Sequence, residues 1–282
     1  MRCMTMTVQG VRVPSFLYGT AWKEDATPGL VTEALGAGFR GIDTANQRKH
    51  YFEEGVGQGL AAKFREGLVT RDEVFLQTKF TFQDGQDERL PYDPAAPIAT
   101  QVAQSFERSL AHLGVTRLDS LILHGPSTSE GLGPDDHAAW RAMEALAVAG
   151  RVRLLGISNV TPRQVSELVA FSTVDVAFVQ NRTYATRGWD RAVRDVCDEH
   201  GIVYQAFSLL TANKHVLANA EVKAIAARHR KSPAQVVFRF AQQVGMLPLT
   251  GTRDPLHMAA DLAIHDLTLD IDELGVIAAG GA

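Results

Sequence analysis

Three ionisable side chains stand at the ends of successive apolar segments. Asp43 ends a candidate strand in "GIDTA", Lys79 ends the next in "FLQTK", and His124 ends the one after in "LILHGP". If these segments are parallel strands, their carboxyl ends meet and the three side chains converge on one mouth. Each residue alone has an ordinary explanation, as a helix cap, a solvated cation or a satisfied polar group. Their joint placement favours a site for catalysis or for binding a small ligand.

Strands and helices alternate along the chain. Helical spacing of apolar residues separates the candidate strands, as in the run Ile98, Val102, Phe106, Leu110 and Leu113. Strict alternation implies parallel pairing, and over 282 residues a closed barrel fits better than an open sheet. The predicted fold class is therefore α/β, a (β/α)8 TIM barrel. The eight candidate strands are "FLYGTAW", "FRGIDTA", "EVFLQTK", "LDSLILHG", "VRLLGISN", "VAFVQN", "IVYQAF" and "MLPLTG".

The connections differ in length on the two sides of the predicted barrel. Long polar stretches come after strands, whereas the returns from helix to strand are short. Loops after strands form the carboxyl face, where barrel enzymes place their active sites. The opening "VQGVRVPS" predicts a short N-terminal hairpin over the barrel floor, with Gly10 in its turn. No linker composition is visible, so residues 1–282 are expected to form a single barrel domain.

Composition excludes several classes of function. With 45% hydrophobic and 21% charged residues the chain is typical of a soluble globular protein, and no apolar run approaches a membrane span. A net charge of −4 with scattered Lys and Arg argues against nucleic acid as a partner. Cys3 and Cys197 make neither a disulfide framework nor a zinc cluster, and no metal is predicted. The N-terminus lacks a signal-like apolar run, so a cytoplasmic location is expected.

The ordered motifs resemble the aldo-keto reductase superfamily from near residue 8 to residue 265. The run from Trp140 to Asn159 is especially specific, because it joins a helix, a turn and a strand that ends in Ser-Asn. The resemblance implies a barrel that binds NADPH or NADH without a Rossmann domain and passes hydride to a small-molecule carbonyl substrate. Monomers are common in such families, so a monomer or weak oligomer is expected. The other matching motifs include "GFRGIDTA", "LDSLILHGP", "YQAFSLL", "SPAQVVFRF" and "LPLTGTRDPLHMAADL".

The family's catalytic tetrad is an Asp, a Tyr, a Lys and a His, and three members match Asp43, Lys79 and His124. The tyrosine usually comes about five residues after the aspartate, where this chain has Arg48. A guanidinium does not release a proton in this pH range, so Arg48 cannot replace it. Tyr51 precedes "FEEGVG", which resembles the segment after the family's catalytic tyrosine. We therefore interpret residues 46–50 as containing a short insertion that leaves Tyr51 in place as the proton donor.

The chemistry gives a reason for Tyr51. Carbonyl reduction needs a proton on the oxygen as hydride reaches the carbon, and a free tyrosine with a pKa near 10 donates reluctantly. A lysine within about 4–6 Å lowers that pKa. Lys79 is expected to do this while paired to Asp43, and His124 to orient the substrate oxygen. Residues 48–50 either rim the pocket or form a solvated charge run, and the second interpretation is favoured.

Cofactor contacts are inferred from the same resemblance. Phe207 occupies the position at which the family has an aromatic ring that stacks on the nicotinamide. Ser158 and Asn159 occupy the positions of the pair that holds the nicotinamide carboxamide. Gly251 replaces a lysine that often meets the 2′-phosphate, and Arg253 would compensate because a guanidinium suits phosphate. NADP is the first choice and NAD the second. The predicted cofactor residues are Thr20, Ser158, Asn159, Gln180, Phe207, Ser208, Leu210, Thr252, Arg253, His257 and Asp261.

Substrate selection is expected to rest on Trp22, Phe80, Phe82 and the long loops. The glycine-rich "GVGQG" at residues 55–59 lacks the G-x-G-x-x-G spacing and is interpreted as a packing feature of a helix start. The alternative function is a nucleotide-binding regulatory or redox-sensing barrel with little turnover, suggested by the displaced tyrosine. The enzyme is favoured, because a pure binder has no need of a tuned acid.

Overall fold

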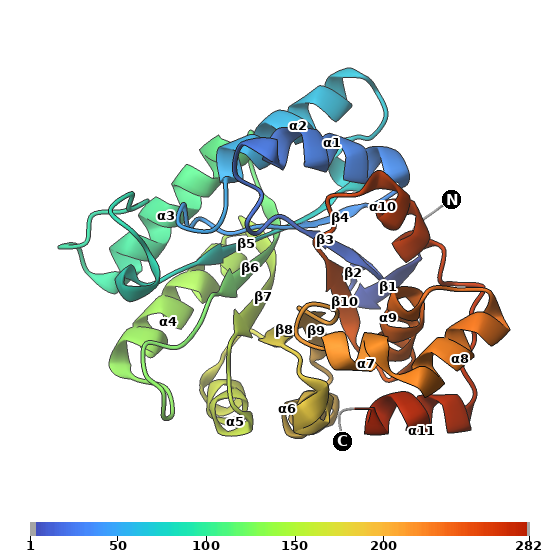
Figure 1. The fold of residues 1–282 in the computed structure, drawn as a ribbon. Coiled ribbons are helices and arrows are strands. Elements are labelled where there is room, and N and C mark those ends of the chain that lie inside the picture. Colours follow the sequence, from blue (N-terminus) through green and yellow to red (C-terminus); the bar gives the residue numbers. More distant parts are fainter. Residues whose placement is uncertain (1–3, 281–282) are drawn as a thin grey trace.

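Eight parallel strands close into a barrel in the computed structural model, which describes residues 4–280 (Figure 1). Around the barrel the strands have the order β10-β3-β4-β5-β6-β7-β8-β9, so each neighbour in sequence is a neighbour in space. The predicted (β/α)8 class is confirmed. The strand bounds are β3 (Leu17–Gly19), β4 (Gly41–Asp43), β5 (Phe75–Phe80), β6 (Leu118–Leu123), β7 (Val152–Ser158), β8 (Val176–Arg182), β9 (Val203–Phe207) and β10 (Leu247–Thr250).

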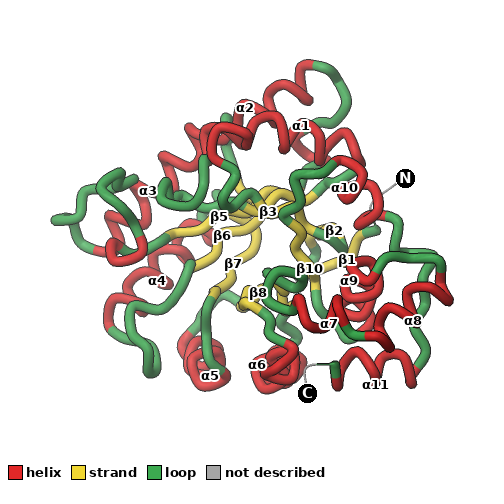
Figure 2. The backbone as a smooth tube through the Cα atoms, viewed as in Figure 1, coloured by secondary structure: helices red, strands yellow, loops and turns green. Residues whose placement is uncertain are grey.

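The helices surround the ring of strands (Figure 2). Their apolar faces pack against the strands, so the main core lies between the two layers. The α-helices are α1 (Thr27–Ala37), α2 (Glu53–Arg65), α3 (Ile98–Leu113), α4 (Pro134–Val148), α5 (Pro162–Phe171), α6 (Arg191–Glu199), α7 (Lys214–Ala218), α8 (Ala220–His229), α9 (Pro233–Gln243), α10 (Pro255–Leu262) and α11 (Ile271–Ala279). Short 3₁₀ turns are Glu24–Ala26, Arg71–Glu73, Gln83–Gly85 and Ala185–Asp190.

Two helices begin at a Thr-Pro or Ser-Pro pair, and each start carries a capping box. At α5 the Thr161 hydroxyl accepts from the Gln164 backbone N–H, and the Gln164 side chain accepts from the Thr161 N–H. At α9 Ser232 and Gln235 make the same reciprocal pair. Each pair satisfies two backbone N–H groups that a helix otherwise leaves without partners.

The N-terminal hairpin closes the floor of the barrel, as predicted. Strands β1 (Thr5–Val8) and β2 (Val11–Pro14) pair antiparallel across a turn at Gln9 and Gly10, which have φ of 47° and 78°. Two left-handed residues suit a tight hairpin turn. The hairpin residues Val8, Val11 and Val13 belong to one apolar cluster with residues of the barrel strands, namely Leu17, Phe75, Ile122, Leu154 and Leu247. The opposite, carboxyl end is left open for a site.

Glycines in "GVGQG" allow α2 to lie close to its neighbours. A Cβ added to Gly57 would lie 1.9 Å from the carbonyl oxygen of His112, and one on Gly59 would lie 2.8 Å from that of Pro28. Both obstacles are backbone atoms of packed helices, so α2 itself would have to move. The glycines therefore serve helix packing, in agreement with the sequence interpretation.

We expect Gly57→Ala to lower the free energy of unfolding by about 2–3 kcal/mol, because overpacking at a backbone contact forces neighbouring elements apart. Urea unfolding of the two proteins measures the difference. Gly36→Ala in α1 is the matched control, since nothing lies within 4 Å of its added methyl group. The control should be neutral or slightly stabilising. Equal stability of Gly57→Ala and the parent protein would contradict the packing argument.

Candidate active site

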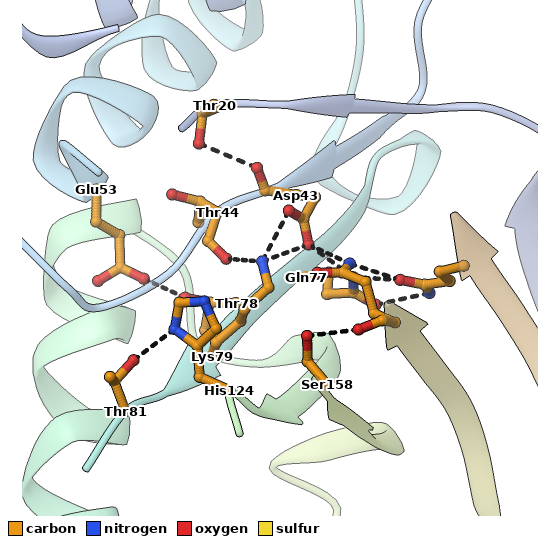
Figure 3. Close-up of polar contacts among 12 residues, drawn as sticks. Thr20, Asp43, Thr44, Glu53, Gln77, Thr78, Lys79, Thr81, His124 and Ser158 are labelled. Carbon is orange, nitrogen blue, oxygen red and sulfur yellow. Dashed lines mark hydrogen bonds and ion pairs between the residues drawn. The ribbon is translucent and has the colours of Figure 1, made fainter. Parts of the chain in front are cut away.

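A buried ion pair forms the floor of the site at the carboxyl ends of β4 and β5. The Lys79 ammonium lies 2.7 Å from both carboxylate oxygens of Asp43 and donates to the Thr44 carbonyl oxygen at 2.8 Å (Figure 3). The side chains of Lys79 and Asp43 are 0% and 4% exposed. The predicted pairing of Asp43 with Lys79 is confirmed, and all three ammonium protons have acceptors.

Three glutamine amides surround the Asp43 carboxylate. Gln77 and Gln180 donate to its Oδ1 at 2.7 Å and 3.1 Å, and Gln205 accepts from both of those amides at 2.8 Å. Sequence analysis missed Gln77 and Gln205. Gln77 precedes Lys79 by two residues, and residues two apart on a strand share a face, which was the available signal. The N–H donors of Gln77 and Gln180 give the buried carboxylate hydrogen-bond partners in addition to Lys79.

Tyr51 lies beside this pair, immediately before α2. The Lys79 Nζ is 5.2 Å from the centroid of its ring, and the His124 ring is 5.9 Å away between centroids. The structure thus brings Asp43, Tyr51, Lys79 and His124 together at the base of one cleft.

The electrostatics of Tyr51 correct the sequence expectation. The pKa of its phenol is raised rather than lowered, because burial disfavours the phenolate and the charge of Asp43 adds to the effect. The charge of Lys79 is balanced by Asp43, and no ammonium proton is left for the phenol. Tyr51 therefore carries its proton throughout the physiological pH range.

His124 is a neutral side chain at the same floor. Burial, followed by the charges of Lys79 and His50, lowers its pKa to about 3, although part of the ring faces the cleft. Its Nδ1 lies 2.7 Å from the hydroxyl of Thr81. Sequence analysis missed Thr81, which comes directly after the end of β5. A neutral imidazole held at one nitrogen can hydrogen-bond a ligand through the other.

Residues 46–50 form an ordered turn that is tied to α3 and to the long loop after β5. Asn46 donates to the Ser105 carbonyl oxygen at 2.8 Å, and Gln47 donates to that of Gly85 at 2.5 Å. Both side chains are buried. Arg48 lies over the Phe52 ring and Lys49 is exposed, and neither lines the cleft, whereas His50 does. The interpretation as a solvated charge run thus fits the exposed Lys49, whereas Arg48 is half-buried over Phe52 and His50 lines the cleft.

The cleft has a volume of about 1040 Å³ and opens at the carboxyl ends of the strands. Trp22 and Phe82 line it, as predicted for a substrate pocket. The structure corrects the placement of Phe80, which is 1% exposed and packs against Phe82 and Tyr92, with ring centroids 5.3 Å and 5.6 Å away. Phe80 comes after the inward Lys79 in β5 and so points out toward the helix layer.

The predicted nicotinamide side of the site is assembled. Ser158, Asn159, Gln180, Phe207 and Ser208 all line the cleft. The Phe207 ring is only partly buried, and the Asn159 side chain donates to the His124 carbonyl oxygen at 2.8 Å, which joins this side to the floor. A flat aromatic face beside amide and hydroxyl groups fits a planar carboxamide ring.

The predicted adenosine side lies beyond the lining residue Gly251. Thr252 and Arg253 lie on the segment that leads into α10, His257 lies in the first turn of that helix, and both Arg253 and His257 are exposed. The missed Lys23 is buried there and donates to the Gly251 carbonyl oxygen at 2.7 Å. Burial, with the charge of Arg253, lowers the pKa of Lys23 to about 8.

Six of the predicted cofactor residues do not line the cleft: Thr252, Arg253 and His257 lie on the adenosine side, and Thr20, Leu210 and Asp261 lie behind the walls. Thr20 is fully buried, and its hydroxyl donates to the Asp43 carbonyl oxygen at 3.0 Å, which fixes the end of β4. Leu210 packs against the main core. Asp261 is buried in α10 and accepts from the Thr250 hydroxyl at 2.8 Å. These residues support the walls of the site rather than lining it.

Ionisation of the buried Asp261 carboxyl group lowers the free energy of unfolding. Burial raises its pKa to about 6, against the stabilising hydrogen bond from Thr250. Because the folded pKa exceeds the unfolded one, the destabilisation is absent below about pH 4, grows between pH 4 and 6 and is complete above pH 6. We expect Asp261→Asn to raise the free energy of unfolding at pH 7.5 by about 2–3 kcal/mol.

Urea unfolding of wild type and Asp261→Asn at pH 7.5 and pH 4 checks this expectation. The stabilisation should disappear at pH 4, where both proteins carry a neutral side chain at this position. A gain of equal size at both pH values would show that packing, and not ionisation, distinguishes the variants.

Comparisons with known proteins agree with this fold and site. Residues 18–279 match the aldo/keto reductase family. The 9,11-endoperoxide prostaglandin H2 reductase of Trypanosoma cruzi is 30% identical over 277 residues, covering 96% of this chain and 89% of the relative. The glyoxal reductase of Bacillus subtilis is 30% identical over 271 residues, covering 95% and 89%.

Solved structures share the fold along the whole chain. An aldo/keto reductase from Brucella melitensis superposes with a TM-score of 0.83 at 26% identity, covering 99% of both chains. A Bombyx mori aldo-keto reductase solved in complex with NADP has a TM-score of 0.84 at 24% identity, covering 99% of this chain and 93% of that one.

The closed barrel and the polar residues at the floor of its cleft place the protein in the class of nicotinamide-dependent oxidoreductases. The chain belongs to the aldo/keto reductase family and is an NAD(P)H-dependent oxidoreductase. Membership implies a small-molecule carbonyl substrate and supports carbonyl reduction in general. Among residues 4–280 no helix has the length and apolar character needed to span a membrane.

Proposed function

We propose that this protein reduces an aldehyde or ketone to an alcohol with NADPH, and that Tyr51 delivers the proton. The observation that carries the proposal is the meeting of Asp43, Tyr51, Lys79 and His124 at the base of the cleft. A protonated phenol, a neutral imidazole and a buried ion pair are the groups that protonation of an alkoxide product requires.

Each side chain has a distinct part in this proposal. His124 holds the substrate oxygen in the tautomer whose Nδ1 accepts from the Thr81 hydroxyl and whose Nε2 carries the proton. Tyr51 transfers its phenolic proton to the same oxygen. Lys79 lies 5.2 Å from the phenol ring, so its charge stabilises the phenolate as it forms. Asp43 and the glutamine amides keep the ammonium fixed while this occurs.

NADPH, when bound, supplies the hydride. Phe207 offers its ring to the nicotinamide, and Ser158 and Asn159 offer polar atoms to the carboxamide. Arg253 is the exposed guanidinium on the adenosine side, which favours the 2′-phosphate of NADP over the hydroxyl of NAD. The Bombyx mori structure, solved with NADP, supports this preference.

A specific observation favours a second function. Because Asp43 and Thr44 occupy every ammonium proton of Lys79, the lysine donates no hydrogen bond to Tyr51. A barrel with this arrangement that binds nucleotide and turns over slowly would act as a redox-sensing or regulatory subunit.

NADPH consumption by the purified protein, measured against aldehydes, dicarbonyls and ketones, distinguishes the two functions. NADPH binding is measured in parallel by nucleotide fluorescence. Turnover with a carbonyl supports the reductase. Tight binding without turnover supports the regulatory function, and the absence of both would contradict each of them.

A further inference from the structure

The turn at residues 46–50 ends in a histidine, His50, that forms part of the cleft wall. The ring of His50 lies on the indole of Trp22, with centroids 4.0 Å apart and planes inclined by 38°. The backbone reinforces this contact, because the Trp22 N–H donates to the His50 carbonyl oxygen at 2.7 Å. Both side chains line the cleft beside Tyr51. The imidazole therefore has a fixed position near the reacting carbonyl.

A chain of hydrogen bonds fixes the tautomer of this imidazole. The Gln47 amide nitrogen donates to the Gly85 carbonyl oxygen, which can only accept, so the amide oxygen must face His50. That oxygen lies 2.9 Å from Nδ1 of His50. Because an amide oxygen also only accepts, Nδ1 carries the proton.

The other ring nitrogen is consequently an acceptor. Burial and the charge of Lys49 lower the pKa of His50 below its usual 6.5, against a smaller effect of Asp87, so the ring is neutral above pH 7. Nε2 then has a lone pair and no proton. It makes no hydrogen bond with any residue in the range 4–280.

We propose that His50 selects carbonyl substrates that also carry a hydroxyl group, whose proton is accepted by Nε2. This inference rests on the proposed reductase and names its substrate class. A hydroxyl can donate to the lone pair, whereas an ether, a second carbonyl or a carboxylate can only accept and leaves Nε2 without a partner. A site built around a hydrogen bond discriminates against analogues that cannot make it.

Matched aromatic aldehydes test this selectivity. At pH 7.5 with saturating NADPH, kcat/KM is compared for 3- and 4-(hydroxymethyl)benzaldehyde, whose hydroxyl groups do not ionise at this pH, and for their methoxy analogues, the methoxymethylbenzaldehydes, which are electronically similar but cannot donate. We expect the better-placed hydroxyl isomer to exceed its methoxy analogue by about tenfold, the size of one net hydrogen bond.

Variants assign that preference to His50. His50→Phe keeps a ring against Trp22 but lacks the lone pair, so the hydroxy-to-methoxy ratio should fall by about five- to tenfold. His50→Gln places an amide oxygen near the position of Nε2 and should restore part of the ratio. Lys214→Gln is the matched control, because Lys214 is exposed and outside the cleft, and its ratio should equal that of wild type.

An unchanged ratio in His50→Phe would overturn the inference, and His50→Leu gives the same test if the phenylalanine variant does not fold. If no aldehyde is reduced, the proposed reductase fails separately. Calorimetric binding of 3-hydroxybenzamide and 3-methoxybenzamide, whose carbonyls are not reduced, then tests His50 directly. A hydroxyl preference lost in His50→Phe supports the inference, and equal affinities in wild type overturn it.

Discussion

Tyr51→Phe is expected to lower kcat by about 100- to 10,000-fold, the range in which a positioned general acid contributes. The substitution removes one oxygen and leaves the ring between Lys79 and His124, so the shape of the floor is kept. The phenol has its proton across the physiological range because burial raises its pKa. Steady-state reduction of an aldehyde measures the loss, and nucleotide fluorescence should show NADPH affinity within about twofold of wild type.

Tyr184→Phe is the matched control for this variant. It removes the same atom from a partly buried tyrosine in the loop after β8, away from the lining of the cleft. Its turnover should equal that of wild type. Full activity in Tyr51→Phe would reject Tyr51 as the proton donor. The neutral His124 would then be the next candidate for that role.

Lys79→Met is expected to lower the free energy of unfolding by about 3–5 kcal/mol, because it leaves a buried carboxylate without its counter-charge. Asp43 and Lys79 are both nearly inaccessible, and the carboxylate would keep only its amide donors from Gln77 and Gln180. Urea unfolding at pH 7.5 measures the loss. Activity should be lost as well, since the phenolate of Tyr51 would have no nearby cation.

The double variant Asp43→Asn, Lys79→Met separates charge from packing. Both buried charges are absent, so more than half of the lost stability should return, while turnover should not. If the double variant is no more stable than Lys79→Met alone, the loss comes from packing around the aliphatic stem of Lys79 and not from the unpaired carboxylate.

The architecture depends on local patterns, and the sequence therefore predicts it well. Parallel strands in a barrel are short apolar runs, and the helices between them repeat at 3.6 residues, so the alternation is visible without any long-range information. The same holds for Asp43, Lys79 and His124, because the end of a strand fixes the face on which its last side chains lie. Tyr51 could be placed because the residues directly after it, "FEEGVG", keep a familiar pattern.

Features that depend on distant partners were not predictable in this way. The sign of the Tyr51 pKa shift depends on how completely Asp43 and Thr44 occupy the Lys79 ammonium, which spacing does not reveal. The burial of Asn46 and Gln47 in the turn at residues 46–50 depends on partners in the loop after β5 and at Ser105 of α3. Phe80, by contrast, could have been placed from the sequence. Because side chains alternate between the two faces of a strand, Phe80 points away from the cleft when Lys79 points toward it, and its prediction as a pocket residue did not take this into account.

The glutamine amides around Asp43 connect catalysis to the cooperativity of folding. They come from β5, β8 and β9, and the bond between Gln77 and Gln205 joins residues 128 positions apart. Contacts of such sequence separation form late, because the intervening chain must first be ordered. A partly folded chain that lacks β8 and β9 would hold Asp43 without two of these amides. The complete amide cluster beside Asp43 is thus present only when β5, β8 and β9 are all in place.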